Sequence, residues 1–172
     1  TTANFVVKGC CDVGTGDLNN ATLSTTQTLS GSFHINGTLN ISGSGTVVTM
    51  SSADVQLNKE AKINVGAGAK LIITGGSYLR TCGSDMWTGI ELLASSAEVQ
   101  LLSKSKIEDA IVAIDAPHNG KVVIDDATLN ANYIGLKITG TGVANSSYIG
   151  SSAIFSCKNS SNVNANCLKS PH

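Results

Sequence analysis

Charged side chains are scarce in this sequence. Of its 172 residues only 13% are charged, and 11 basic residues nearly balance 12 acidic ones, for a net charge of −1. A surface that binds phosphate backbones or anionic lipid needs an excess of lysine and arginine. The composition therefore argues against nucleic acid as a partner.

Proline and aromatic residues are also few, at 2 prolines and 4% aromatics, whereas glycine reaches 18 residues. Disordered chains share such a composition, but regularly spaced valine, isoleucine and leucine residues indicate a folded core. No apolar run approaches the roughly 20 residues of a membrane-spanning helix, and no basic region followed by an apolar stretch opens the sequence. We therefore expect one folded domain without membrane insertion.

Helical periodicity is nearly absent from the chain. The one segment with a helix-like apolar stripe, residues 107–114, is rich in β-branched residues and lies between two strand-like segments, so we predict a strand. Elsewhere apolar and polar residues alternate over short runs that are broken by Gly, Asn, Asp and Ser. Such runs are typical of short strands with one buried face.

The apolar runs recur with a period. The phrase Ala-Asp-Val-Gln-Leu at 53–57 returns as Ala-Glu-Val-Gln-Leu at 97–101 and, more loosely, at 120–124. This alignment makes Val55, Val99 and Val122 equivalent, and the two steps between them fit two repeats and one repeat of the same length. A second column of isoleucines, at Ile90, Ile111 and Ile134, advances by nearly equal steps. Both columns indicate a repeat of about 21 to 23 residues.

The repeat predicts an all-β fold, a β-solenoid of the right-handed, single-stranded parallel β-helix type, because each period holds two or three short strands and no helix. About seven coils of this length fit in the chain. Within a period one apolar residue follows another by seven or eight positions, in the pairs Val55 and Ile63, Leu71 and Leu79, Val99 and Ile107, and Val122 and Leu129. Glycines in 66–68 and 75–76 are predicted to form corners. An antiparallel sandwich is the alternative fold.

Three regions are expected along the chain. Residues 1–30 keep poor register and are predicted to form an N-terminal cap or irregular first coil. Residues 31–156 are predicted to form the parallel β-helix, and residues 157–172 a C-terminal cap or tail. A solenoid needs caps because its ends expose apolar core and unpaired strand edges.

The five cysteines are spaced irregularly, at Cys10, Cys11, Cys82, Cys157 and Cys167. None forms a Cys-x-x-Cys pair and the three histidines lie far from them in sequence, so no zinc site is expected. We predict that Cys157 and Cys167 close a loop and that Cys82 reaches Cys10 or Cys11, which leaves one cysteine to stay reduced or to pair between chains. Such pairing favours an oxidising, extracellular setting.

One segment resembles a known class of proteins. Residues 82–92 read Cys-Gly-Ser-Asp-Met-Trp-Thr-Gly-Ile-Glu-Leu, and residues 63–73 before them read Ile-Asn-Val-Gly-Ala-Gly-Ala-Lys-Leu-Ile-Ile. A Cys, a short spacer and Met-Trp-x-Gly-Ile resemble a coil of large secreted and cell-surface β-helix proteins of Bacteroidota, many of them cargo of the type IX secretion system. The resemblance covers roughly residues 38–138 and implies a secreted or surface location and a role as repeat scaffold.

Many β-helices are polysaccharide lyases or hydrolases, which gather carboxylates with a basic side chain or calcium. The candidate ligand contacts here are Arg80, which is the one arginine, Asp85 and Trp87, whose indole can stack on a sugar ring. The favoured interpretation of Trp87 is a buried or half-buried anchor of its coil, with the sugar contact as the alternative. His34 alternates with Phe33 and Ile35 and is therefore expected to face outward.

Acidic residues provide one candidate metal site. Asp109 and Asp115 could approach Asp125 or Asp126 on a neighbouring coil and bind calcium, but the favoured interpretation of these residues is a solvated acidic edge. No catalytic residue and no cofactor-binding residue is assigned.

These patterns together predict a non-enzymatic structural or adhesive module of a secreted or surface protein. Weakly capped ends would let terminal coils of two copies pair head to tail, which makes filaments. The alternative is a carbohydrate-binding or carbohydrate-cleaving, polysaccharide-lyase-like β-helix with surface glycans as partners.

Overall fold

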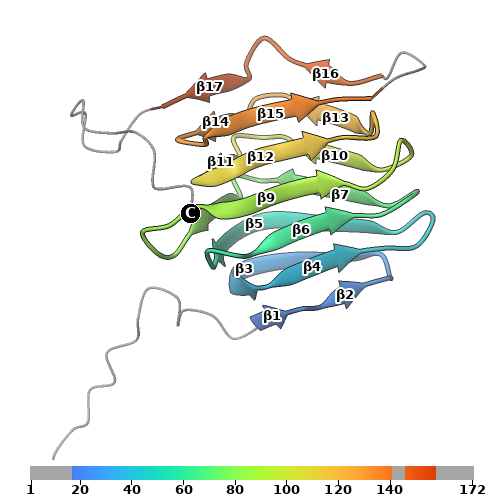
Figure 1. Ribbon diagram of the computed structural model, residues 1–172, viewed down its shortest axis with the longest axis horizontal. Helices are drawn as coiled ribbons and strands as arrows, with labels where there is room; N and C mark the ends of the chain where they lie inside the picture. Colours follow the sequence, from blue (N-terminus) through green and yellow to red (C-terminus); the bar gives the residue numbers. More distant parts are fainter. Residues whose placement is uncertain (1–16, 141–145, 158–172) are drawn as a thin grey trace, which may run out of the picture.

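The computed structural model describes residues 17–140 and 146–157, which form a right-handed parallel β-solenoid (Figure 1). Strands are the regular secondary structure of these residues, without helices, and every strand pair in this part of the chain is parallel. The predicted all-β solenoid is thus confirmed and the antiparallel sandwich was wrong. Residues 107–114 form strand and not helix, as predicted, but they belong to two strands, β11 (Lys106–Glu108) and β12 (Ala110–Ala116), with Asp109 at the corner between them.

Each coil has three sides, which we number in the order in which the chain visits them. Side 3 is a separate six-stranded sheet, at the front of Figure 1, that contains β2 (Thr22–Leu23), β4 (Thr38–Ile41), β6 (Lys62–Val65), β9 (Trp87–Leu92), β12 (Ala110–Ala116) and β15 (Ile134–Ile138). Sides 1 and 2 share an eleven-stranded sheet because the long strands β3 (Gln27–Asn36) and β5 (Val47–Leu57) take part in both.

The remaining strands each belong to one side. Side 1 continues with β7 (Lys70–Thr74), β10 (Glu98–Leu101), β13 (Lys121–Ile124) and β16 (Tyr148–Ile149). Side 2 contains β1 (Asp17–Asn19), β8 (Tyr78–Thr81), β11 (Lys106–Glu108), β14 (Thr128–Asn130) and β17 (Ile154–Ser156). Parallel pairing therefore already begins at Asp17, ahead of residue 31.

The described chain makes about five turns, not about seven. Some coils are longer than the sequence period indicated. On side 1 Val48 is in register with Leu71, and Leu71 with Val99, so the second of these two coils contains more residues than the first. Loops of different length at the corners account for this variation.

One predicted column mixes two sides of the solenoid. Val99 and Val122 are in register on side 1, as predicted, but their neighbour below is Leu71. Val55 lies on side 2, in register with Leu79. The error arises because strands on sides 1 and 2 carry the same alternation of apolar and polar residues, so a local phrase does not show which side it occupies.

The predicted column of isoleucines does not match the observed register either. Ile90 is in register with Ile114, and Ile134 with Val112, so Ile111 is not a member. Ile111 lies between Ala110, which is in register with Trp87, and Val112, which is in register with Gly89, so it is out of line with Ile90 even before the register shift that follows Val112. The predicted step of seven or eight residues within a coil agrees better with the structure. From Leu71 on β7 to Leu79 on β8, this step leads from side 1 to side 2.

The inward side chains stack into continuous columns. On side 2 the column Val55, Leu79, Ile107 and Leu129 is 0 to 2% exposed. Stacking coils about 4.8 Å apart pairs the backbone of each strand and buries these side chains at the same time.

Glycines occupy the corners, as predicted. Gly68 has a φ of +70° and lies so close to Ser44 that a Cβ atom would be 3.1 Å from its Cα. Gly89, by contrast, lies within β9 and not at a corner; it has a φ of +122°, and a Cβ there would overlap the carbonyl oxygen of Val112 on the next coil. The glycine of the Met-Trp-x-Gly-Ile segment is therefore required by the close approach of two coils.

Candidate functional site

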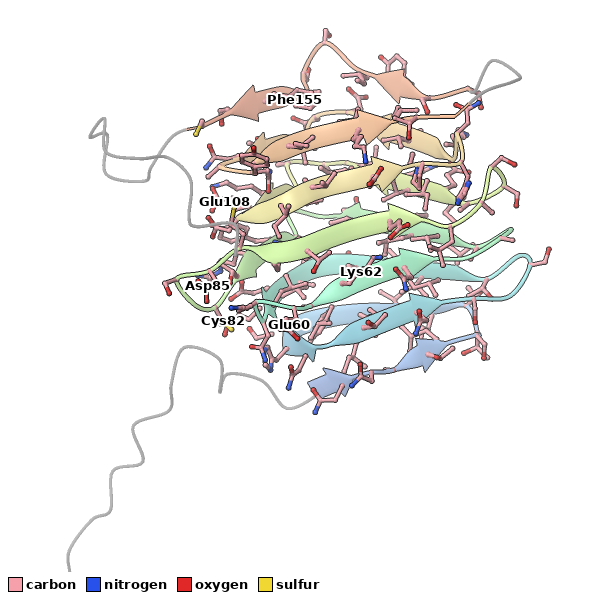
Figure 2. The ribbon with its side chains drawn as sticks, in the orientation of Figure 1. Glu60, Lys62, Cys82, Asp85, Glu108 and Phe155 are labelled. Atoms are coloured by element: carbon pink, nitrogen blue, oxygen red, sulfur yellow. The ribbon has the colours of Figure 1, made fainter. Side chains whose placement is uncertain are left out.

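A cleft of about 360 Å³ lies at the corner between side 2 and side 3. It is lined by polar side chains and one glycine, from Asn36, Asn58, Lys59, Glu60, Thr81, Cys82, Gly83 and Asp85. Figure 2 shows Glu60, Cys82 and Asp85 gathered at this edge of the molecule. The lining comes from three successive coils, so the cleft is a product of their stacking.

An insertion in one coil makes the wall of the cleft. Leu79 is in register with Ile107, and Ile107 with Leu129, and the first of these two coils is the longer one. Its additional residues include the irregular segment 82–86 between β8 and β9. This segment extends beyond the regular corner and encloses space beside it.

Asparagine side chains form the floor of the cleft. The Nδ2 of Asn58 donates to the Oδ1 of Asn36 at 2.7 Å, and the same corner position is Cys82 on the coil above. The Sγ of Cys82 lies 3.3 Å from the Oδ1 of Asn58. Since Asn58 is engaged at both ends of its amide, the floor is held in one arrangement.

His34 supports this floor from the neighbouring strand. Its Nε2 is 2.8 Å from the Oδ1 of Asn58 and 3.8 Å from the Sγ of Cys82. The alternation with Phe33 and Ile35 predicted an outward histidine, yet His34 is only 6% exposed. The imidazole is buried because it packs against the polar side chains at the corner.

Charged side chains on the rim of the cleft differ from those on the flat sides. Lys59 and Glu60 are exposed and Asp85 is half-buried, and none of the three makes an ion pair within residues 17–140 and 146–157. The charges on the sides are paired between or along strands, as in Lys62–Glu91, Lys70–Glu98, Lys121–Glu98, Arg80–Asp54, Lys106–Glu108 and Lys137–Asp115. The rim therefore presents charge that is available to a ligand.

The three predicted ligand contacts do not converge. Trp87 is fully buried and its Nε1 donates to the carbonyl oxygen of Glu108 at 2.7 Å, so it is an anchor of its coil and cannot stack on a sugar. Arg80 pairs with Asp54 at 3.0 Å on side 2, and this hydrogen-bonded partner raises the pKa of Arg80. Of the predicted contacts, Asp85 alone lines the cleft.

A second polar cluster on side 2 is closed on itself. Tyr78 donates to Glu108, which also accepts from Asn130 and pairs with Lys106. The guanidinium of Arg80 and the ammonium of Lys106 lie 4.9 and 5.0 Å from the centre of the Tyr78 ring. The groups of this cluster satisfy one another, which indicates a structural role.

The cluster shifts the ionisation of its members. Burial, followed by the hydrogen bond to Glu108, raises the pKa of Tyr78 far above its ordinary value. Burial by itself raises the pKa of Glu108, but hydrogen bonds from Lys106, Tyr78 and Asn130 outweigh it and lower the pKa below its ordinary value. Tyr78 is therefore neutral and Glu108 charged at neutral pH.

The acidic residues considered for calcium lie on different parts of the coil. Asp115 is on side 3 and pairs with Lys137 at 3.2 Å, whereas Asp125 and Asp126 follow β13 at the corner between sides 1 and 2. Asp109 is at the corner between sides 2 and 3. In the described part of the chain no three His, Cys, Asp or Glu side chains are grouped to hold a metal ion.

Of the cysteines, Cys82 lies at the cleft and Cys157 is exposed. Cys10, Cys11 and Cys167 lie outside the described residues. The predicted pairings of Cys82 with Cys10 or Cys11 and of Cys157 with Cys167 therefore stay predictions.

Comparison with known proteins finds no matching family model, no matching curated protein and no matching solved structure. The likeness of residues 63–73 and 82–92 to Bacteroidota surface proteins therefore stays a hypothesis that rests on those residues. Among the residues that the structure describes, no helix is long and apolar enough to span a membrane.

Sequence reasoning missed most of the cleft. Asn36, Asn58 and Glu60 were not assigned to a site, although two features of the sequence point to this corner. Asn36 and Asn58 are the same residue type one coil apart, and the segment 82–86 lengthens its coil beyond the period.

Proposed function

We propose that this protein is a non-enzymatic structural or adhesive module of a secreted or surface protein, and that its solenoids join end to end into filaments. The observation that carries the proposal is the open last coil. Phe155 on β17 is in register with Leu129, yet Phe155 is 49% exposed and Leu129 is 2% exposed. A position that belongs to the core column is thus uncovered on one side.

The other sides of the last coil are open in the same way. Ile149 on β16 is in register with the fully buried Ile124 and is 50% exposed. Within the described residues β15, β16 and β17 each pair with one neighbouring strand and leave the opposite edge unpaired. Such an end combines apolar surface with free backbone donors and acceptors, which is a template for another strand.

The first coil of a second copy of this chain has a shape that fits the open last coil. Its first coil has the same three sides, and the edges of β1, β2 and β3 face away from the last coil. Leu18, Leu23 and Leu29 continue the core columns there and are only partly buried. Because all strands of one side run in the same direction, a first coil can continue a last coil as one more parallel coil. Such a head-to-tail contact does not close on itself and yields a fibre.

The sides of the solenoid support a scaffold role. Their charges are neutralised by ion pairs across neighbouring coils, and amides form ladders, as between Asn64 and Asn40 at 3.0 Å. These contacts stiffen the stack of coils. The secreted or surface location is supported by the irregularly spaced cysteines and by the resemblance of residues 82–92.

Electron microscopy and light scattering of the purified chain over a range of concentrations test the proposal. We expect rods that lengthen with concentration to many times the length of one solenoid. The double substitution Ile149→Ser with Phe155→Ser should abolish the rods while circular dichroism keeps its β signature. Leu93→Ser is the matched control, because Leu93 is 43% exposed but does not lie on the last coil, and it should leave assembly unchanged. A wild-type chain that stays monomeric at every concentration overturns the proposal.

A further inference from the structure

The cleft between sides 2 and 3 carries an inference that is independent of assembly. We propose that it binds a neutral saccharide of one or two sugar rings through the sugar hydroxyl groups. Its volume of about 360 Å³ lies in the range of small-molecule sites. Most of the residues that line it carry a charged, amide or hydroxyl group, which can form hydrogen bonds with a polar ligand.

The mixture of groups on the rim fits hydroxyl groups best. A sugar hydroxyl donates one hydrogen bond and accepts others, so a saccharide site needs acceptors and donors side by side. The carboxylates of Glu60 and Asp85 accept, the ammonium of Lys59 donates, and the amide of Asn36 does both. With one positive and two negative groups, the rim has no positive excess that would select a polyanion.

The rim groups are free to bind, which distinguishes them from the other charges of the molecule. Lys59, Glu60 and Asp85 have no ion pair among the described residues, so a ligand would not have to break one. Hydrogen bonds to charged groups are about twice as strong as neutral ones. These three side chains are therefore expected to provide most of the affinity.

The site is also held in place before a ligand arrives. Asn58 is fixed by Asn36 and His34, and the amide of Gly83 donates to the hydroxyl of Thr81 at 3.3 Å. The segment 82–86 is followed at once by the buried Trp87, whose indole is bonded to the next coil. A rigid frame lowers the entropy cost of binding.

A titration of the full-length, ¹⁵N-labelled chain followed by two-dimensional NMR tests the inference. The probes are four neutral disaccharides, cellobiose, maltose, lactose and diacetylchitobiose, with digalacturonate as the charged comparison. We expect at least one neutral probe to give saturable shifts at millimolar concentration in the amides of Asn36, Glu60, Gly83 and Asp85. Absence of such shifts for all four, or stronger binding of digalacturonate, overturns the inference.

Substitutions locate the binding to the cleft. Glu60→Gln and Asp85→Asn should each weaken the binding of the active probe about tenfold or more, because each removes a charged hydrogen-bond acceptor. Asp126→Asn is the matched control, since Asp126 is exposed outside the cleft and its left-handed backbone, with a φ of +46°, suits asparagine. Binding that survives both cleft substitutions would place the ligand elsewhere and contradict the inference.

Discussion

The middle of the solenoid and its last coil differ although their strands follow the same pattern. Leu79 and Phe155 both occupy the inward column of side 2, and they are 0% and 49% exposed. The side chain alone does not decide this difference, since both are large and apolar. What decides it is whether a further coil covers the position: among the described residues, the last coil exposes an apolar side chain at a position that a covered coil buries.

Shortening one side chain of the inward column of side 2 should give the largest difference in stability between the covered middle and the open coil. Leu79→Ala in the covered middle should lower the free energy of unfolding by about 2–5 kcal/mol, because it leaves a cavity between two coils. Phe155→Ala at the open coil should cost well under half as much in a monomeric sample, since half of that ring already contacts water. Urea denaturation monitored by circular dichroism measures both. Equal losses would show that the last coil is covered in solution.

The next largest loss of stability is expected at Trp87, which lies in the covered middle of the solenoid. Trp87→Phe removes the donor to the carbonyl oxygen of Glu108 and leaves a buried acceptor without its partner. We expect a loss of about 1–3 kcal/mol in the free energy of unfolding. Tyr133→Phe is a suitable control because Tyr133 is 56% exposed and should lose almost nothing.

Acid should weaken the covered middle through Glu108. The pKa of Glu108 in the folded chain is below its ordinary value of 4.5, so its stabilising contribution is present above that value and is lost as the pH falls through the folded pKa. Unfolding curves between pH 7 and pH 3 should show this fall, and Glu108→Gln should flatten it. An unchanged slope in that variant would assign the acid sensitivity to other carboxylates, such as Glu98, whose pKa is also lowered.

At high pH the stabilising contribution of Tyr78 to the same cluster should be lost. The pKa of Tyr78 is raised above its ordinary value of 10.0, so its contribution is complete below that value and is lost as the pH rises through the folded pKa. Ultraviolet titration at the phenolate absorption should show one tyrosine that ionises later than the others. Tyr78→Phe should remove that late transition.

The smallest effect is expected near the open coil. Lys137 and Asp115 join β15 to β12 at 3.2 Å, and the lysine side chain is 45% exposed. Lys137→Ala should change the free energy of unfolding by no more than about 1 kcal/mol because solvent screens an exposed pair. A larger loss would mean that the last coil depends on this pair.

The fold was predictable from the sequence more fully than the cleft. Alternation along segments such as 62–65 and 98–101 is a local signal of strands with one buried face, and its recurrence indicated stacking. The cleft has no such signal, because its lining residues are separated in sequence and meet only where three coils stack. Trp87 illustrates the limit, since the same residue fits a sugar contact or a core anchor until its neighbours are known.

By itself the sequence determined that this chain coils as parallel strands with glycines at its corners, because alternation and backbone φ requirements are local properties. Only the tertiary structure decided which columns stack, since corner segments such as 82–86 change the length of a coil and shift the register of all that follows. It also decided that Asn36, Asn58, Glu60 and Asp85 share one cleft while Arg80 is paired on side 2. Hydrogen bonding between coils sets that register, and it joins residues that lie a whole coil apart in the sequence.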